Sequence, residues 1–68
     1  MKIRYQIIEG GITTLDTELQ SRNIYSAMHE LLTKYGIRYN PSQLQHRGDW
    51  LYFNTGQDVL YRTSARMG

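Results

Sequence analysis

Two histidines are the side chains of this sequence best suited to acid–base chemistry. A histidine titrates near neutral pH and can move protons, and His46 has Arg47 and Asp49 beside it. This arrangement could cleave RNA, as in some small toxin ribonucleases. We favour the alternative that His46 and His29 are ordinary surface side chains. Two histidines without any cysteine, and without ligand spacing, do not indicate zinc, so we expect no metal site.

The carboxylates offer no second catalytic arrangement. None of the six is placed as an acid–base pair, and Asp16 and Glu18 are better explained as strand neighbours of Arg4 and Lys2. The sequence contains no nucleophile elbow and no dinucleotide-binding fingerprint. We therefore expect that the chain is not an enzyme and needs no cofactor.

Apolar side chains on both faces of an expected hairpin are the most informative feature. One face carries Leu51, Phe53, Val59 and Tyr61, and the other carries Trp50, Tyr52 and Leu60. A single helix covers only one side of a small sheet, so we expect Trp50 and Tyr52 to face away from the core. An exposed aromatic patch rimmed by polar groups indicates a contact surface. The alternative is that the sheet curls and residues 38–47 cover these rings.

Arginines near these aromatic residues narrow the class of partner. The first 34 residues balance four basic against four acidic side chains, so the net charge of +2 arises in the second half. Arginine beside aromatic rings suits protein contacts and also stacking on unpaired bases. A charge of +2 is small for nucleic-acid binding, which typically uses a concentrated basic stripe.

These features predict a non-enzymatic protein-binding module of the regulator or inhibitor type, such as those that phages encode. Its contact residues would be Trp50, Tyr52, Leu60, Arg38, Arg47 and Arg62. The partner would be another protein or a second copy of the chain. RNA or single-stranded DNA binding by the same aromatic residues is the alternative, and a ribonuclease that uses His46 is a weaker one.

Alternating side chains predict a hairpin at the start of the chain. In residues 2–8 the apolar side chains alternate with Lys2, Arg4 and Gln6, and residues 12–19 alternate in the same way, with two glycines between the two segments. A two-residue turn would place carboxylates on the apolar face. We therefore expect a three-residue loop that pairs Tyr5 with Leu15 and Arg4 with Asp16, with Gly11 left-handed.

Helical spacing follows over residues 22–35. The apolar stripe consists of Ile24, Ala27, Met28, Leu31, Leu32 and Tyr35. Ser21 is the expected N-cap and Gly36 the expected C-cap. The helix should lie across the sheet face that carries Ile3, Tyr5, Ile7 and Leu15.

The second half of the chain is less regular. Residues 37–39 could form a short strand, 40–42 a turn, and 49–53 and 59–63 a hairpin, with residues 64–68 frayed. A helix over 56–67 is the rival for the last segment, but Val59, Leu60 and Tyr61 favour a strand. The expected fold is a single α+β domain over residues 1–68, with the order ββαββ and one helix on a mainly antiparallel sheet.

The order of hairpin, helix and strands over residues 1–53 resembles the β-grasp (ubiquitin-like) superfold. The resemblance rests on the opening Met1-Lys2-Ile3, the turn Gly10-Gly11, and a helix that ends in Gly36-Ile37 before a proline. Members that act as carriers end in a Gly-Gly tail, whereas this chain ends in Arg66-Met67-Gly68. The resemblance therefore points to members that only bind partners, through a sheet face or edge.

Length and composition set the remaining limits. With 68 residues, 40% hydrophobic and 21% charged, the chain is expected to fold as one domain with little stability to spare. No disulfide can contribute, so a partner would supply stability. No apolar run approaches the roughly 20 residues of a spanning helix, and the N-terminus lacks the apolar stretch of a signal peptide. We therefore expect a cytoplasmic protein without membrane contact.

Overall fold

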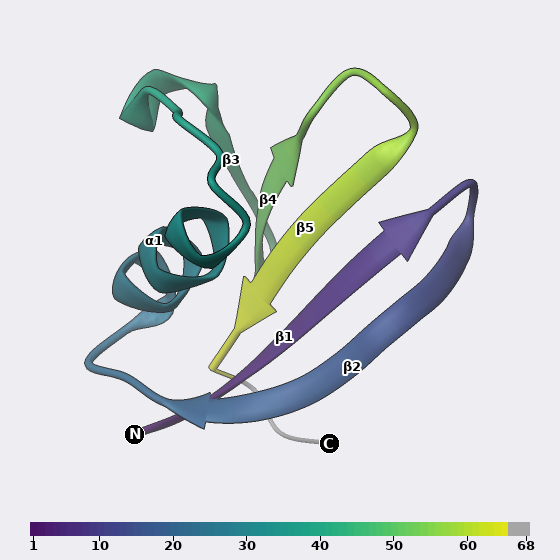
Figure 1. Cartoon of the computed structure of the whole chain (residues 1–68). Helices are drawn as coiled ribbons and strands as arrows, with labels where there is room; N and C mark the ends of the chain where they lie inside the picture. The colour runs from purple at the N-terminus through teal and green to yellow at the C-terminus, as the bar shows by residue number, and fades with distance from the viewer. Residues whose placement is uncertain (66–68) are drawn as a thin grey trace.

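The computed structural model describes residues 1–65 as one helix packed on a five-stranded antiparallel sheet (Figure 1). The elements along the chain are β1 (Lys2–Glu9), β2 (Ile12–Gln20), α1 (Ile24–Lys34), the short 3-10 helix η1 (Pro41–Gln43), β3 (Leu44–Arg47), β4 (Trp50–Asn54) and β5 (Val59–Ser64). The strands lie in the order β2-β1-β5-β4-β3, so β1 pairs with β5 at the centre of the sheet. The expected α+β class is confirmed, and β3 is a strand that the expected order ββαββ lacks.

The turn of the first hairpin corrects the expected three-residue loop. Glu9 pairs with Ile12, which leaves a two-residue turn of Gly10 and Gly11. Both glycines have positive φ, +58° and +80°, a conformation that other residues adopt only with strain. Two adjacent residues with positive φ make the turn that suits the twist of a two-residue hairpin.

A β-bulge explains why the expected faces are nevertheless right. Ile8 pairs with Thr13 and Ile7 with Leu15, so Thr14 is an extra residue in β2. This extra residue returns Leu15 to the face that a three-residue loop would give it. Beyond the bulge, Tyr5 pairs with Thr17 instead of Leu15, a shift of two positions that keeps every side chain on its expected face.

The helix begins two residues later than expected. Its N-cap is Asn23, not Ser21, and the Asn23 Oδ1 accepts a hydrogen bond of 2.8 Å from the Ser26 N–H. At the other end the C-cap is Tyr35 instead of the expected Gly36, which follows it and is left-handed, at φ +70°. The Ile37 N–H bonds back to the Leu32 carbonyl and closes a Schellman turn.

The chain after the helix differs more from expectation. Residues 37–39 form no strand, and Tyr35, expected in the apolar stripe, is 47% exposed. Val59–Ser64 forms β5, which confirms the strand over the helical rival as far as residue 65. Ser64 is fully buried and not frayed, while Arg66-Met67-Gly68 lies outside the described residues.

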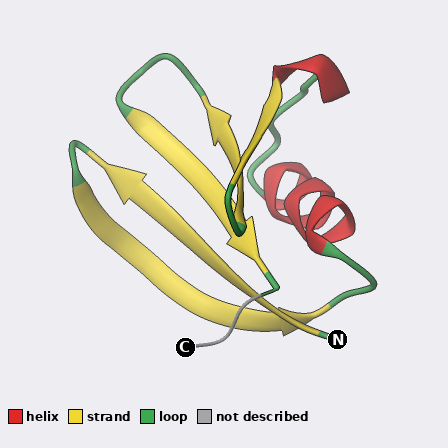
Figure 2. Cartoon of the chain, turned by 180° about the vertical axis from the view of Figure 1, so that it is seen from behind, coloured by secondary structure: helices red, strands yellow, loops and turns green. Residues whose placement is uncertain are grey.

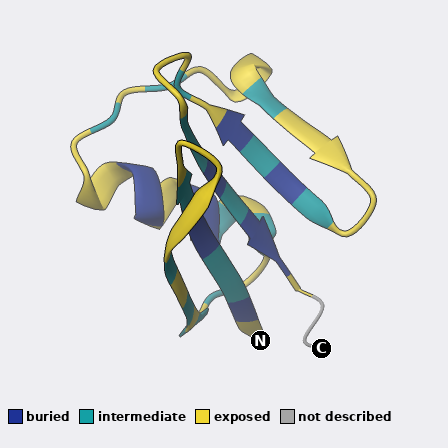
Figure 3. Cartoon of the chain, turned by 90° about the vertical axis from the view of Figure 1, so that its right-hand side faces the viewer, coloured by how far each residue is buried: buried dark blue, intermediate teal, exposed yellow. Residues whose placement is uncertain are grey.

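The core lies between α1 and the sheet face that we call the inner face. The helix packs against β5, β1 and β4, and lies to one side of the sheet in both views (Figures 1 and 2). Burial alternates along β4, with buried residues on the inner face (Figure 3). The central cluster consists of Ile7, Met28, Leu31, Leu32, Leu51, Phe53 and Tyr61, with Tyr5 and Leu15 packed against it. Within residues 1–65, no helix has the length and apolar character needed to cross a membrane.

Candidate functional site

Three neighbouring strands bring most of the expected contact residues to one face. In the register of β3, β4 and β5, Arg47 lies opposite Trp50 and Tyr52 lies opposite Arg62. Residues directly opposite in an antiparallel pair share a face, and Leu60 lies two positions from Arg62 on the same strand. This face, which we call the outer face, is the side of the sheet opposite α1.

Arg62 is fixed in place by contacts to two other strands. Its guanidinium carbon lies 4.1 Å from the centroid of the Trp50 ring, so the charge stacks on the indole. Its Nε donates a hydrogen bond to the Oε1 of Gln6, a β1 residue that is 6% exposed. The side chain therefore lies along the sheet between β1 and β4.

The same hydrogen-bonded row continues to the edge strand β2. Gln6 donates through Nε2 to Asp16 Oδ2 at 3.0 Å, and Arg4 donates two bonds to the Asp16 carboxylate, at 2.9 and 2.7 Å. The bonds from Arg4 and then from Gln6 lower the pKa of Asp16 from 3.8 to about 2. The expected partnership of Arg4 and Asp16 is thus present, although the two residues sit diagonally and not directly opposite.

The β3–β5 part of the outer face is hollowed and carries no carboxylate. A hollow of about 370 Å³ is lined by Gln45, Arg47, Tyr52, Asn54 and Leu60. Among the described residues, the outer positions of these three strands hold two arginines and no acidic side chain. This hollow therefore offers apolar, aromatic and guanidinium groups to a negatively charged ligand.

Trp50 and Tyr52 are half-buried and not fully exposed. One side of the indole lies against the Arg62 guanidinium. Tyr39 packs against Phe53 on the inner face, whereas residues 44–47 form β3, whose Gln45 and Arg47 lie beside Tyr52 and Trp50 on the outer face. Within residues 1–65 the structure places no helix over the outer face, and both rings keep part of their surface exposed.

Arg38 does not belong to this surface. It lies in the segment that follows α1, and it lines two hollows on the helix side, one with His29 and Tyr39 and one with Glu9. The cause is the Schellman turn at Gly36, which keeps the chain on the helix side instead of continuing it into a strand. The expected grouping of Arg38 with the outer-face residues is therefore wrong.

The two histidines lie on the helix side, away from the outer face. His46 packs edge-on against Tyr25 with ring centroids 6.3 Å apart, whereas Arg47 points to the opposite face of β3. His29 Nδ1 shares a hydrogen bond of 2.9 Å with the Tyr39 hydroxyl. The expected neighbours His46 and Arg47 thus do not converge on one site.

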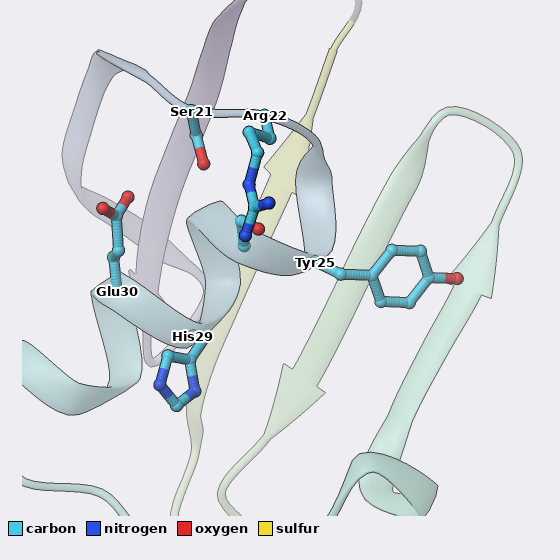
Figure 4. A pocket seen from close by; sticks show the side chains of 6 residues that line it. Ser21, Arg22, Tyr25, His29 and Glu30 are labelled. Atoms are coloured by element: carbon cyan, nitrogen blue, oxygen red, sulfur yellow. The ribbon is translucent and has the colours of Figure 1, made fainter.

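A second hollow runs along the exposed side of the helix. Its volume is about 510 Å³, and its lining includes Arg22, Tyr25, His29 and Glu30 (Figure 4). Figure 4 shows Tyr25 and Glu30 pointing to opposite sides of the helix, so the polar groups do not converge on one point. In the described part of the chain, no three histidine, aspartate or glutamate side chains are grouped to hold a metal ion.

Gln6 is the contributor to the outer face that the sequence analysis missed. It was placed correctly on the polar face of β1, but its role depends on the pairing of β1 with β5, which brings it opposite Arg62. No local pattern indicates that pairing, because the two residues are 56 positions apart. A polar residue at the middle of a strand is the one signal that was present.

Comparison of the chain with protein families, curated proteins and solved structures finds no match. The interpretation of the outer face therefore depends on its own geometry, and the resemblance to the β-grasp superfold stays a prediction.

Proposed function

We propose that this chain is a non-enzymatic protein-binding module whose outer face binds an acidic segment of a partner protein. The contact surface consists of Trp50, Tyr52 and Leu60 with Arg47 and Arg62. The observation that carries the proposal is the fixed Arg62 guanidinium, which is stacked on Trp50 and bonded to Gln6 through Nε. Its two terminal amino groups can meet a carboxylate.

Preorganisation is the physical reason why Arg62 suits this task. A free arginine loses rotamer entropy when it binds, at a cost on the order of 1 kcal/mol for a side chain of this kind. In this protein the contacts with the Trp50 indole and the Gln6 amide already order the Arg62 side chain when the chain folds, so binding costs it less entropy. A guanidinium held flat presents two parallel N–H donors, the geometry that a carboxylate accepts.

Charge and apolar contact together favour a protein over a nucleic acid. Two arginines on the outer face of β3–β5 are few for a strand of phosphates, which binds mainly through many cationic contacts. One face of the Trp50 ring is already covered by Arg62 and is not open to a base. The floor of Leu60 and Tyr52 suits an apolar side chain between acidic ones.

Trp50 is the only tryptophan, so its fluorescence reports directly on this face. The test titrates the protein with a short synthetic peptide of alternating glutamate and leucine, and separately with a short oligouridine. We expect the peptide to bind and Arg62→Gln to weaken it by about tenfold or more, since hydrogen bonds to charged groups contribute about 1.5–3 kcal/mol. Arg38→Gln is the matched control, because it removes the same charge from the helix side.

The outcomes separate the alternatives. Arg62→Lys keeps the charge but loses the two parallel N–H donors of the guanidinium. Its affinity for the peptide should lie between that of the wild type and that of Arg62→Gln. Failure of the peptide to bind, or equal weakening by Arg62→Gln and Arg38→Gln, would contradict the proposal. Oligouridine binding that exceeds peptide binding and collapses with added salt would replace it with the RNA alternative.

A further inference from the structure

The edge of β2 that does not pair with β1 is the longest open strand edge of the described chain. β2 spans nine residues, Ile12–Gln20, and hydrogen-bonds to β1 on one side only, because it lies at the end of the sheet. An open edge presents unpaired N–H and C=O groups and is a template for another strand. β2 contains neither proline nor lysine, but the bulge at Thr14 twists the first part of this edge, which leaves residues 15–20 as its regular part.

The inner face of β2 carries two leucines, Leu15 and Leu19, which we call the apolar shelf and which the helix covers only in part. Leu15 and Leu19 are only half-buried, since α1 packs against β5, β1 and β4 instead. The space between the shelf and the helix is a hollow of about 260 Å³, lined in part by Leu19, Leu31 and Tyr5. In Figure 1, β2 forms the edge of the sheet next to β1. A strand added to β2 would place alternate side chains beside these leucines.

The other face of β2 carries exposed negative charge. Asp16 and Glu18 both point outward from this strand and are exposed. Asp16 forms an ion pair of 2.7 Å with Arg4 of β1, and Glu18 lies opposite Arg4, so the two carboxylates form the row nearest the open edge. Oppositely charged side chains on an added strand would therefore be attracted, and acidic ones repelled.

These charges disfavour a second copy of the chain as the occupant. A two-fold antiparallel pairing of β2 centred on Thr17 would set Leu15 against Leu19, but it would also set Asp16 directly against Glu18. A pairing centred on Asp16 would oppose the two Asp16 carboxylates. Centres nearer the turn run into the bulge at Thr14, and centres nearer residue 20 leave few residues paired. Like charges directly opposite destabilise a strand pair.

We infer that the β2 edge accepts an extended segment of a partner protein in which apolar and basic side chains alternate. The apolar residues lie beside Leu15 and Leu19, the basic residues lie beside Asp16 and Glu18, and main-chain hydrogen bonds join the two strands. This site is separate from the Trp50 surface, because β1 and β5 lie between β2 and β4.

The test uses a labelled synthetic peptide of alternating lysine and valine, followed by fluorescence anisotropy. Two control peptides keep the composition: one groups the lysines in a block, and one carries N-methyl groups on alternate residues, which removes its donors. We expect the alternating peptide to bind and to slow amide hydrogen exchange in β2. Both control peptides should bind at least about tenfold more weakly, because strand addition depends on register and on main-chain donors.

Variants of the protein locate the site. Glu18→Lys should weaken the alternating peptide by about tenfold, since an attraction is replaced by a repulsion between directly opposed charges. Asp49→Lys makes the same change in charge in the turn between β3 and β4, and should have a much smaller effect. Arg47→Gln, which changes the Trp50 surface but lies outside the row of Arg62, Gln6 and Asp16, should have none, which separates this site from the proposed function.

Three results would overturn the inference. They are equal affinity for the alternating and blocked peptides, protection of amides outside β2 only, and equal effects of Glu18→Lys and Asp49→Lys. A dimer by light scattering at micromolar concentration, in which the β2 amides are protected without peptide, would assign the edge to a second copy instead.

Discussion

Asp16 and Arg62 stand at the two ends of a hydrogen-bonded row that crosses the outer face. Gln6 joins them, accepting from Arg62 and donating to Asp16. The amide has both a donor and an acceptor, so it can satisfy two groups of opposite charge from a largely buried position. Arg62 is therefore oriented through a residue that carries no charge itself.

The state of Asp16 makes the row sensitive to acid. Its pKa is lowered from 3.8 to about 2, because Arg4 and then Gln6 bond to the ionised carboxylate. A lowered pKa in the folded state gives stability that is fully present above about pH 4 and is lost as the pH falls towards 2. Titration of the carboxyl carbon by NMR should therefore place the Asp16 midpoint well below 3.8.

Asp16→Asn provides the thermodynamic counterpart of this measurement. The variant should lose less stability than the wild type between pH 4 and pH 2, because the titrating group is gone. Denaturation by urea at several pH values gives the comparison. An Asp16 midpoint near 3.8 would mean that the bonds to Arg4 and Gln6 do not persist in solution.

At the scale of elements, the start of α1 gives a sharp test of the local structure. Asn23, whose Oδ1 accepts from the Ser26 N–H, is the N-cap, whereas Ser21 lies two residues earlier and outside the helix. Asn23→Ala should lower the free energy of unfolding by about 1 kcal/mol, the usual contribution of a capping side chain. Ser21→Ala should change it by less than about 0.5 kcal/mol. Urea denaturation measures both free energies. A larger loss of stability for Ser21→Ala than for Asn23→Ala would indicate that the helix begins at Ser21 instead.

Alternation and helical spacing were sufficient to predict the faces of β1, of β2 beyond the bulge, of α1 and of β4. They could not predict the bulge at Thr14, because a bulge changes pairing without changing the pattern of faces beyond it. The same limit applies to β3, which is short and carries polar residues at most positions. Local pattern thus determines the faces, while pairing depends on contacts between distant residues.

The candidate site shows the same division. Trp50, Tyr52, Leu60, Arg47 and Arg62 were grouped correctly because their strands and faces follow from alternation. The position of Arg38 depends on where the Schellman turn sends the chain, and the role of Gln6 depends on the pairing of β1 with β5. The pairing of β1 with β5 is not encoded within a few residues of Gln6, and Gly36 predicts the end of the helix but not the side of the sheet on which the chain continues.

For the whole molecule, the decisive property is a sheet covered by a helix on one face only. The buried apolar cluster lies between α1 and the inner face, while the outer face holds half-buried rings and arginines. A domain of this size has roughly 3–5 kcal/mol of stability to spare. Changes on the inner face should therefore destabilise the fold, and changes on the outer face should mainly affect binding.

Phe53 and Tyr52 allow this asymmetry to be measured with one type of substitution. They are neighbours in β4, but Phe53 is 4% exposed on the inner face and Tyr52 is half-buried on the outer one. Phe53→Leu should lower the free energy of unfolding by about 1–1.5 kcal/mol, and Tyr52→Leu by less than about 0.5 kcal/mol. Urea denaturation at two protein concentrations makes the comparison complete. If Tyr52→Leu lowers the free energy of unfolding as much as Phe53→Leu does, and if this loss grows with protein concentration, a second copy covers the outer face. Association stabilises the folded state by mass action. If the costs are as expected and do not change with concentration, the outer face stays free for another protein.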